Sequence, residues 1–117
     1  MVSSYREYVK KPIPARTVAR RLAVQLLYEA DVRGSLSPQR INQFLHKHAR
    51  KRTIRAYAEH LIEGVLKHTE ALDERLSGLS RDWAWERVSP VERSILRLAA
   101  YELLHCEDVP PKVALNE

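Results

Sequence analysis

Apolar residues recur every three or four positions along most of the chain, which is the spacing of one buried face of an α-helix. The first such stretch covers residues 15–31, and later stretches cover residues 41–48, 54–76 and 91–104. Ala, Leu, Arg and Glu dominate the composition and only 3 glycines occur, which also favours helix. The sequence therefore predicts an all-α fold.

Residues with strong end preferences divide these stretches into separate helices. Gly34 is a typical residue just past a helix end, so we expect the first helix to run from Ala15 to about Val32. Ser37 followed by Pro38 predicts the start of a second helix, which ends near residue 50. Thr53 is the expected cap of a third, longer helix that continues to Gly78.

Two positions in the later helices predict how they pack. Gly64 lies inside the third helix and costs about 1 kcal/mol relative to alanine, so we expect a neighbouring helix to approach closely there. The sequence Ser89-Pro90-Val91-Glu92 is a capping box with proline at the first helical position. The helix that it begins is apolar over most of its circumference, which predicts the central buried helix of the fold.

Charge is distributed very unevenly along the 117 residues. Residues 1–56 contain 13 Lys or Arg and 3 Asp or Glu, whereas residues 57–117 contain 7 and 12, so the two parts carry net charges of +10 and −5. This asymmetry indicates a polyanionic partner for the first part, with nucleic acid as the leading candidate. The alternative is a solvated basic face without a partner.

Several classes of function lack their sequence signals. The chain contains no phosphate-binding glycine loop, no paired cysteines and no helical His-Glu-x-x-His pattern. It also has no secretory signal, no apolar run long enough to span a bilayer and only one cysteine, Cys106. We therefore expect a cytoplasmic binding protein that is not an enzyme and has no cofactor or metal.

The first helix combines an apolar face with basic residues on its other side. Its apolar positions are Ala19, Leu22, Ala23, Leu26, Leu27 and Ala30. Arg16, Arg20 and Arg21 occupy the first two turns of the opposite face, where arginines can clamp phosphates. Tyr28 lies two turns further on, as a half-buried core edge or as a stacking platform for a base. A second basic cluster comprises Lys47, Arg50, Lys51, Arg52 and Arg55.

Two blocks of this sequence resemble the NusB family of bacterial antitermination factors. Residues 19–28, ARRLAVQLLY, are similar to the family's opening R-x-x-A-V-Q-x-L-Y. Residues 88–117, VSPVERSILRLAAYELLHCEDVPPKVALNE, are similar to its V-E-[RK]-x-[IV]-L-R-[IL]-A-x-Y-E-L…D-V-P-x-K-V-A-[IL]-N-E. The second block is long and detailed, which makes the resemblance specific.

The resemblance implies an all-α fold of two packed three-helix bundles. It also implies binding of boxA-type single-stranded RNA together with NusE, a small-subunit ribosomal protein, and assembly into the RNA polymerase elongation complex. By this resemblance Arg16, Arg20, Arg21 and Lys112 contact RNA. We also expect Lys10 and Lys11 of the basic arm to bind RNA. By the same resemblance, Tyr28 and Glu92 face NusE.

The expected organisation is a flexible basic arm over residues 1–14 and a single domain over residues 15–117. Within the domain, a first bundle covers about residues 15–52 and a second about residues 53–117. The family continues with a further helical segment past the position of Glu117, so we expect the second bundle to be incomplete. The expected oligomeric state is a monomer or a homodimer. Two alternatives remain: the RNA-binding domain of an rRNA methyltransferase, and a protein-interaction module without RNA binding.

Overall fold

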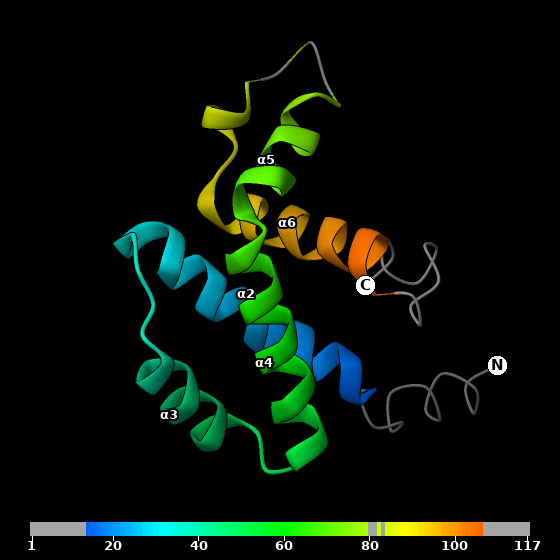
Figure 1. Cartoon of the computed structure of the whole chain (residues 1–117). Helices are drawn as coiled ribbons and strands as arrows, with labels where there is room; N and C mark the ends of the chain where they lie inside the picture. The colour runs from blue at the N-terminus through cyan, green and yellow to red at the C-terminus, as the bar shows by residue number, and fades with distance from the viewer. Residues whose placement is uncertain (1–13, 80–81, 83, 107–117) are drawn as a thin grey trace, which may run out of the picture.

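The computed structural model describes residues 14–79, 82 and 84–106, and every regular element in these ranges is helical. The elements are α2 (Ala15–Arg33), α3 (Pro38–His48), α4 (Arg52–Lys67), α5 (Thr69–Ser77), the 3₁₀ helix η1 (Trp85–Arg87) and α6 (Pro90–His105) (Figure 1). The predicted all-α fold is confirmed. The expected arm, with Lys10 and Lys11, and the C-terminal pattern, with Lys112, lie outside the described residues.

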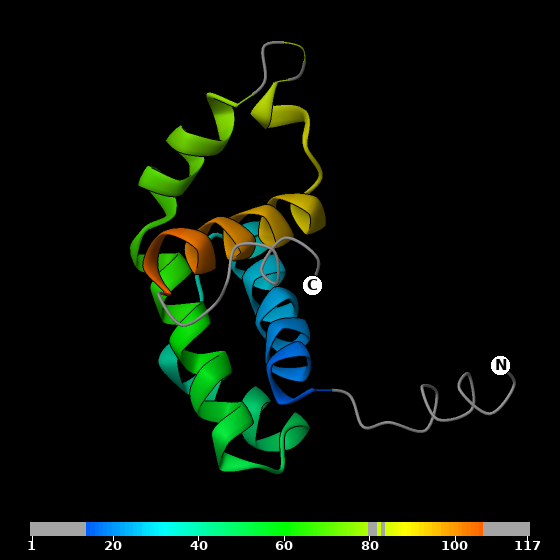
Figure 2. The same ribbon diagram turned by 90° about the vertical axis from the view of Figure 1, so that its right-hand side faces the viewer.

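Helix α2 is the element around which the other helices are arranged. Helix α4 packs along α2, α3 packs against both of them, and α6 crosses α2 on another side (Figures 1 and 2). Helix α5 packs against α6 and η1. The expected division near residue 52 would place α4 in the second bundle, whereas α4 has its most extensive packing against α2.

The core forms where α2 and α4 face each other and α6 closes over them. Its fully buried side chains come from small and branched apolar residues, including Ala19, Ala23, Leu26, Ala58, Leu61 and Ile62. Small alanines on both helices let the two backbones approach, which explains the long α2–α4 contact. No helix among the described residues is long and apolar enough to cross a membrane.

Helix α6 differs from the expected central buried helix. It buries Ser94, Leu98, Tyr101 and Glu102, whereas Val91, Ile95, Leu103 and Leu104 are 36–48% exposed. The reason is that α2, α4 and α5 cover only one side of α6, although its apolar residues surround most of its circumference. The central position belongs to α2.

Most of the expected helix boundaries are confirmed. Gly34 has φ 81° and donates its backbone N–H to the Ala30 carbonyl at 2.8 Å, which ends α2 in the left-handed conformation that favours glycine. The hydroxyl oxygens of Ser37 and Ser89 accept the backbone N–H groups of Arg40 and Glu92 at 3.1 and 3.2 Å. Both serines therefore cap their helices as predicted.

The expected third helix is in fact two helices, α4 and α5, separated at His68. This residue has φ −107° and ψ 15°, and the Thr69 hydroxyl donates to the Val65 carbonyl at 2.7 Å. That side-chain bond competes with the regular backbone ladder and accompanies the break. Thr53 is not the cap, because α4 begins one residue earlier, after Lys51.

The prediction for Gly64 is confirmed. A Cβ atom built at this position would collide with the ring of Tyr101 from α6. Glycine is therefore required here for the close approach of α6 to α4, and this approach offsets the lower helix propensity of the residue.

Candidate nucleic-acid interface

Arg16 lies in the first turn of α2, with its side chain exposed at the surface. Its guanidinium carbon is 4.9 Å from the centre of the Tyr57 ring, which belongs to α4. This is the geometry of a cation–π contact, which holds the guanidinium flat against the aromatic face. The N-terminal end of α2 also carries the positive end of the helix dipole, so the surface here attracts anions.

Arg20 does not lie on the exposed face that the sequence predicts for it. Its side chain is only 5% exposed, and its Nε and Nη2 atoms donate to the two carboxylate oxygens of Glu102 at 2.8 and 3.0 Å. Glu102 on α6 is 1% exposed. The physical reason for the difference is this buried carboxylate, which satisfies a guanidinium that would otherwise have to reach solvent.

Tyr57 joins the same buried group. Its hydroxyl donates to Oε2 of Glu102 at 2.8 Å, so one carboxylate holds a side chain from α2 and another from α4. Burial raises the pKa of the Tyr57 hydroxyl well above its usual value, and the hydrogen bond to Glu102 raises it further. Arg16 therefore contacts an aromatic ring whose hydroxyl is held by the buried Arg20–Glu102 pair.

Sequence reasoning missed Glu102 and Tyr57 as parts of this arrangement. Tyr57 falls on the apolar stripe of α4, where it is naturally assigned to the core. The available signal for Glu102 is a carboxylate four residues after Leu98, on the side of α6 that is otherwise buried. A charge in such a position requires a buried partner.

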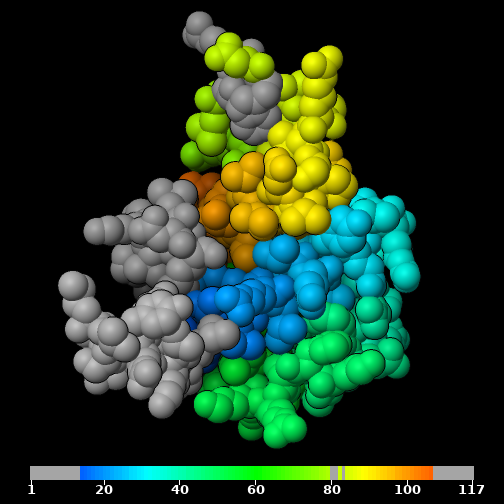
Figure 3. All heavy atoms as spheres, turned by 180° about the vertical axis from the view of Figure 1, so that it is seen from behind, coloured from blue at the N-terminus to red at the C-terminus, as the bar shows by residue number. Residues whose placement is uncertain are grey.

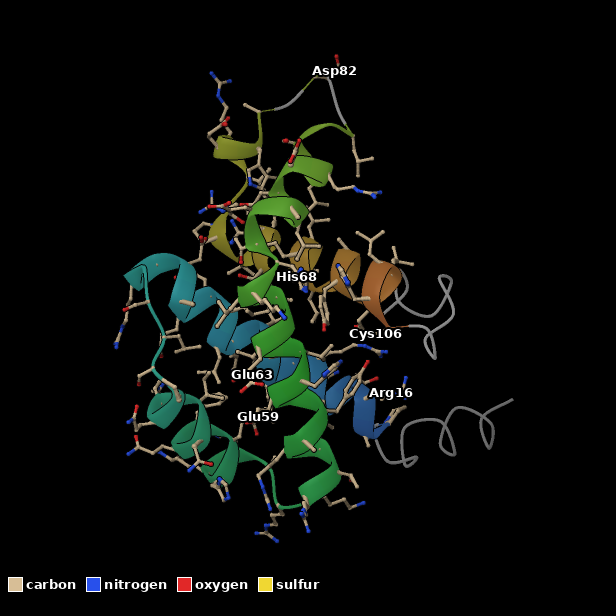
Figure 4. The ribbon with its side chains drawn as sticks, viewed as in Figure 1. Arg16, Glu59, Glu63, His68, Asp82 and Cys106 are labelled. Carbon is tan, nitrogen blue, oxygen red and sulfur yellow. The ribbon has the colours of Figure 1, made fainter. Side chains whose placement is uncertain are left out.

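The remaining basic residues of the interface are mostly exposed. Arg21 lies on the surface of α2, one position beyond the buried Arg20. The second basic cluster runs from Lys47 in the last turn of α3 to Arg52 and Arg55 at the start of α4, and all of its members except the half-buried Arg55 are exposed. Figure 4 shows Arg16 on one side of α4, with the acidic side chains of Glu59 and Glu63 on the other side. The acidic residues of α4 are thus separated from the Arg16 surface.

Tyr28 and Glu92, the residues expected to face a protein, lie toward the other end of α2. The Tyr28 side chain is 41% exposed and lines a groove between α2 and α3 with Gln25, Val32, Phe44 and His48, among others. Glu92 is exposed in the first turn of α6. Its backbone N–H donates to Ser89, which leaves its carboxylate at the surface while the helix end is capped.

An ion-pair network connects this end of α2 to α5 and α6. Arg93 donates to Oδ2 of Asp31 at 2.7 Å, and Arg97 donates to Oδ1 of Asp31 at 3.2 Å and to both carboxylate oxygens of Asp73 at 2.6 and 2.7 Å. Partial burial raises the pKa of Asp31, but the hydrogen bonds from the two arginines outweigh it and lower the pKa overall. Figure 3 shows the start of α6 lying directly over the C-terminal part of α2.

Two of the five histidines, His68 and His105, stack on one another. The rings of His68 and His105 are 4.3 Å apart with an angle of 19° between their planes, and Tyr101 stacks on His105 at 5.1 Å. Burial and the neighbouring His68 lower the pKa of His105. Within the described ranges, no three His, Cys, Asp or Glu side chains converge to hold a metal ion.

The fold and these surfaces define an all-α domain with a basic surface at one end of its central helix and an aromatic groove toward the other end. The chain belongs to the NusB family, whose sequence profile matches residues 17–117. The transcription antitermination protein NusB of Rubrobacter xylanophilus is 44% identical over 103 residues, which cover 88% of this chain and 72% of the relative. The NusB of Syntrophus aciditrophicus is 38% identical over 87% of this chain and 63% of the relative.

Solved structures agree with this assignment. The structure of T. maritima NusB matches with a TM-score of 0.73 and 26% identity, over 91% of this chain and 74% of that chain. A chain in the crystal structure of a plectonemic RNA supercoil matches with a TM-score of 0.79 and 26% identity, over 89% of this chain and 76% of that chain. This chain spans roughly two thirds of the length of the curated relatives and three quarters of the matched structures.

Proposed function

We propose that this protein is a transcription antitermination factor that binds boxA-type single-stranded RNA together with NusE and joins the RNA polymerase elongation complex. Its membership of the NusB family supports this function, and relatives that are 38–44% identical carry the antitermination name. In this proposal the protein works by binding alone, without catalysis or a cofactor. It acts in the cytoplasm, where transcription and RNA are found.

The observation that carries the proposal is the Arg16 guanidinium held on the Tyr57 ring at the basic end of α2. A guanidinium in this position can donate to phosphate oxygens, and its plane can also stack with an unpaired base. Arg21 supplies a second exposed guanidinium about one and a half turns along the same helix, roughly 140° around its axis from Arg16. Arg20 is a positioning residue, because it acts through Glu102 and Tyr57 on the placement of Arg16.

The other proposed contacts complete the interface. Lys10, Lys11 and Lys112 would add phosphate contacts beyond the described residues. NusE would occupy the surface that includes Tyr28 and Glu92, where an exposed aromatic ring lies in a groove beside α3. RNA and protein would thus approach opposite ends of α2, so both could bind at the same time.

The test measures binding of a fluorescently labelled boxA-type RNA by anisotropy, with and without NusE. We expect the double substitution Arg16→Ala with Arg21→Ala to weaken RNA binding about tenfold or more, because each lost guanidinium removes charge-assisted contacts to phosphate. We also expect affinity to fall steeply with salt, since bound phosphates release counterions. Helical content by circular dichroism should not change.

Arg75→Ala is the matched control, because Arg75 is an exposed arginine on α5, away from this interface. It should bind RNA as the unmodified protein does. A folded double variant with full affinity would move the RNA site elsewhere on the protein. Retained NusE binding by a protein that binds no RNA would instead identify a protein-interaction module.

A further inference from the structure

The turn between α3 and α4 concentrates positive charge to an unusual degree. Residues 32–58 contain seven Lys or Arg and no Asp or Glu. Four of the cations have exposed side chains at this turn or in the helical residues next to it, and they are Lys47, Arg50, Lys51 and Arg52. Within the part of the chain that the structure describes, none of the four has a carboxylate within ion-pair distance.

Several arginines elsewhere in the molecule are matched with carboxylates. Arg20 pairs with Glu102, Arg40 with Glu29, and Arg97 with two aspartates. Lys47 interacts favourably with the C-terminal end of the α3 dipole, but mutual repulsion among four neighbouring cations is unfavourable for folding. Such a cluster is instead suited to an external polyanion.

The backbone at this turn is held in a defined conformation. One nitrogen of Arg55, the fifth cation of the cluster, donates to the carbonyls of Ala49 and Arg50, both at 2.8 Å. Arg55 thereby closes the end of α3 and fixes the direction in which the chain enters α4. The four exposed cations are therefore presented from an ordered turn.

This cluster lies at the same end of the molecule as the Arg16 surface. Ala15 and Arg16 from α2 line a shallow hollow with Thr53 and Tyr57 from α4, so the first turns of both helices border one depression. Figures 1 and 2 show the starts of α2 and α4 at the same end of the molecule, with the α3–α4 turn beside them. The two basic surfaces thus lie at the same end of the molecule, although Arg52 and Arg55 of the cluster line a separate hollow that includes Glu59.

We propose that the α3–α4 turn is a second RNA-binding surface, which binds the phosphate backbone of RNA that continues past Arg16. The inference rests on the proposed function and extends it, because it gives the protein a longer RNA footprint than the end of α2 alone would provide. RNA fits this surface better than an acidic protein does. The exposed large apolar side chains among the described residues lie on α2, α4, α5–η1 and α6, and none lies at the turn, whereas protein interfaces need an apolar centre.

The experiment compares a core RNA, limited to the boxA-type element, with the same RNA extended by about ten nucleotides at its 5′ or 3′ end. The test variant combines Arg50→Ala, Lys51→Ala and Arg52→Ala, and keeps Arg55 so that the turn is preserved. The matched control combines Lys67→Ala, Arg75→Ala and Arg87→Ala, which removes three exposed cations from other parts of the surface. Anisotropy is measured over a range of salt concentrations.

We expect one of the extended RNAs to bind the unmodified protein more tightly than the core RNA does. The test variant should lose about tenfold in affinity for that extended RNA, and its salt dependence should decrease by about two logarithmic units of affinity per logarithmic unit of salt. Binding of the core RNA should change by less than about threefold, and the control variant should retain the length dependence. The extension that makes binding to the unmodified protein tighter shows which end of the RNA reaches the turn.

Equal affinities of the core and extended RNAs for the unmodified protein would overturn the inference and leave the proposed function intact. So would a test variant that matches the control on every RNA. Loss of NusE binding in the test variant, with RNA binding unchanged, would assign the turn to the protein partner and also overturn it. If the unmodified protein binds none of the RNAs, the proposed function fails and the inference fails with it.

Discussion

The two ends of the central helix α2 use arginine in opposite ways. Toward its C-terminal end, Arg93 and Arg97 bind Asp31 and Asp73, and these pairs join three helices. At the N-terminal end, the α3–α4 turn carries exposed cations that have no carboxylate within ion-pair distance among the described residues, and Arg16 contacts an aromatic ring. Arginine content alone therefore does not indicate a binding surface, because nearby carboxylates decide which arginines remain available to a partner.

Arg20 marks the border between these two regions. It lies in the sequence between exposed Arg16 and exposed Arg21, yet its guanidinium is buried against Glu102. Its contribution to the basic surface is indirect, through the Tyr57 ring beneath Arg16. The first two turns of this helix thus contain a structural arginine and two exposed arginines that we propose bind RNA, and substitutions should separate them.

The largest expected change in stability comes from substitution in the buried Arg20–Glu102 ion pair. We expect Arg20→Met to lower the free energy of unfolding by about 3–5 kcal/mol, because it leaves the Glu102 carboxylate buried without its cationic partner. Urea denaturation followed by circular dichroism measures this loss. Arg21→Ala, the neighbouring exposed arginine, should change stability by no more than about 0.5 kcal/mol.

The double variant Arg20→Met with Glu102→Leu distinguishes pairing from simple packing. It removes both charges, so it should be more stable than Arg20→Met alone. A double variant whose loss equals the sum of the two single losses would show that the ion pair is not the source of the effect.

This pair also shows where sequence reasoning on α2 is insufficient. Arg20 is three and seven residues before Ala23 and Leu27, which is the spacing of the buried face. Its charge nevertheless assigns it to the exposed side, because its partner Glu102 is 82 residues away in the sequence. The spacing is compatible with burial of Arg20, but only the fold shows which carboxylate makes that burial possible.

Local signals were more informative than patterns of apolar residues. The caps at Ser37 and Ser89, the left-handed Gly34 and the close contact at Gly64 each depend on neighbouring backbone or on one residue's shape, and all could be predicted. The break at His68 could not, because the apolar stripe continues through it. The exposure of α6 depends on which elements cover it, and its own sequence contains no information about that.

An intermediate effect should separate the paired arginines from the unpaired ones. We expect Arg97→Ala to lower the free energy of unfolding by about 1–3 kcal/mol, because Asp31 and Asp73 lose charge-assisted hydrogen bonds in a partly buried site. Arg52→Ala should change it by no more than about 0.5 kcal/mol. Similar losses in the two variants would contradict the distinction between structural and available arginines.

The smallest expected effect concerns how the helices begin. Ser37 and Ser89 cap α3 and α6, whereas α2 and α4, whose first turns lie at the basic end, begin without a side-chain cap. Lys51 precedes α4 with φ −80° and ψ 131°, an extended conformation that also suits a capping serine. We expect Lys51→Ser to raise the free energy of unfolding by about 0.5–1 kcal/mol.

Lys51→Ala removes the same charge without adding a cap, so the difference between the two variants isolates the capping term. If Lys51→Ser is no more stable than Lys51→Ala, the start of α4 is already satisfied in another way. For both variants, affinity for the extended RNA should depend less on salt. The slope of log affinity against log salt concentration should decrease by about 0.7 for one lost phosphate contact. Higher stability of Lys51→Ser together with weaker RNA binding would show that Lys51 increases RNA affinity at the expense of the stability of α4.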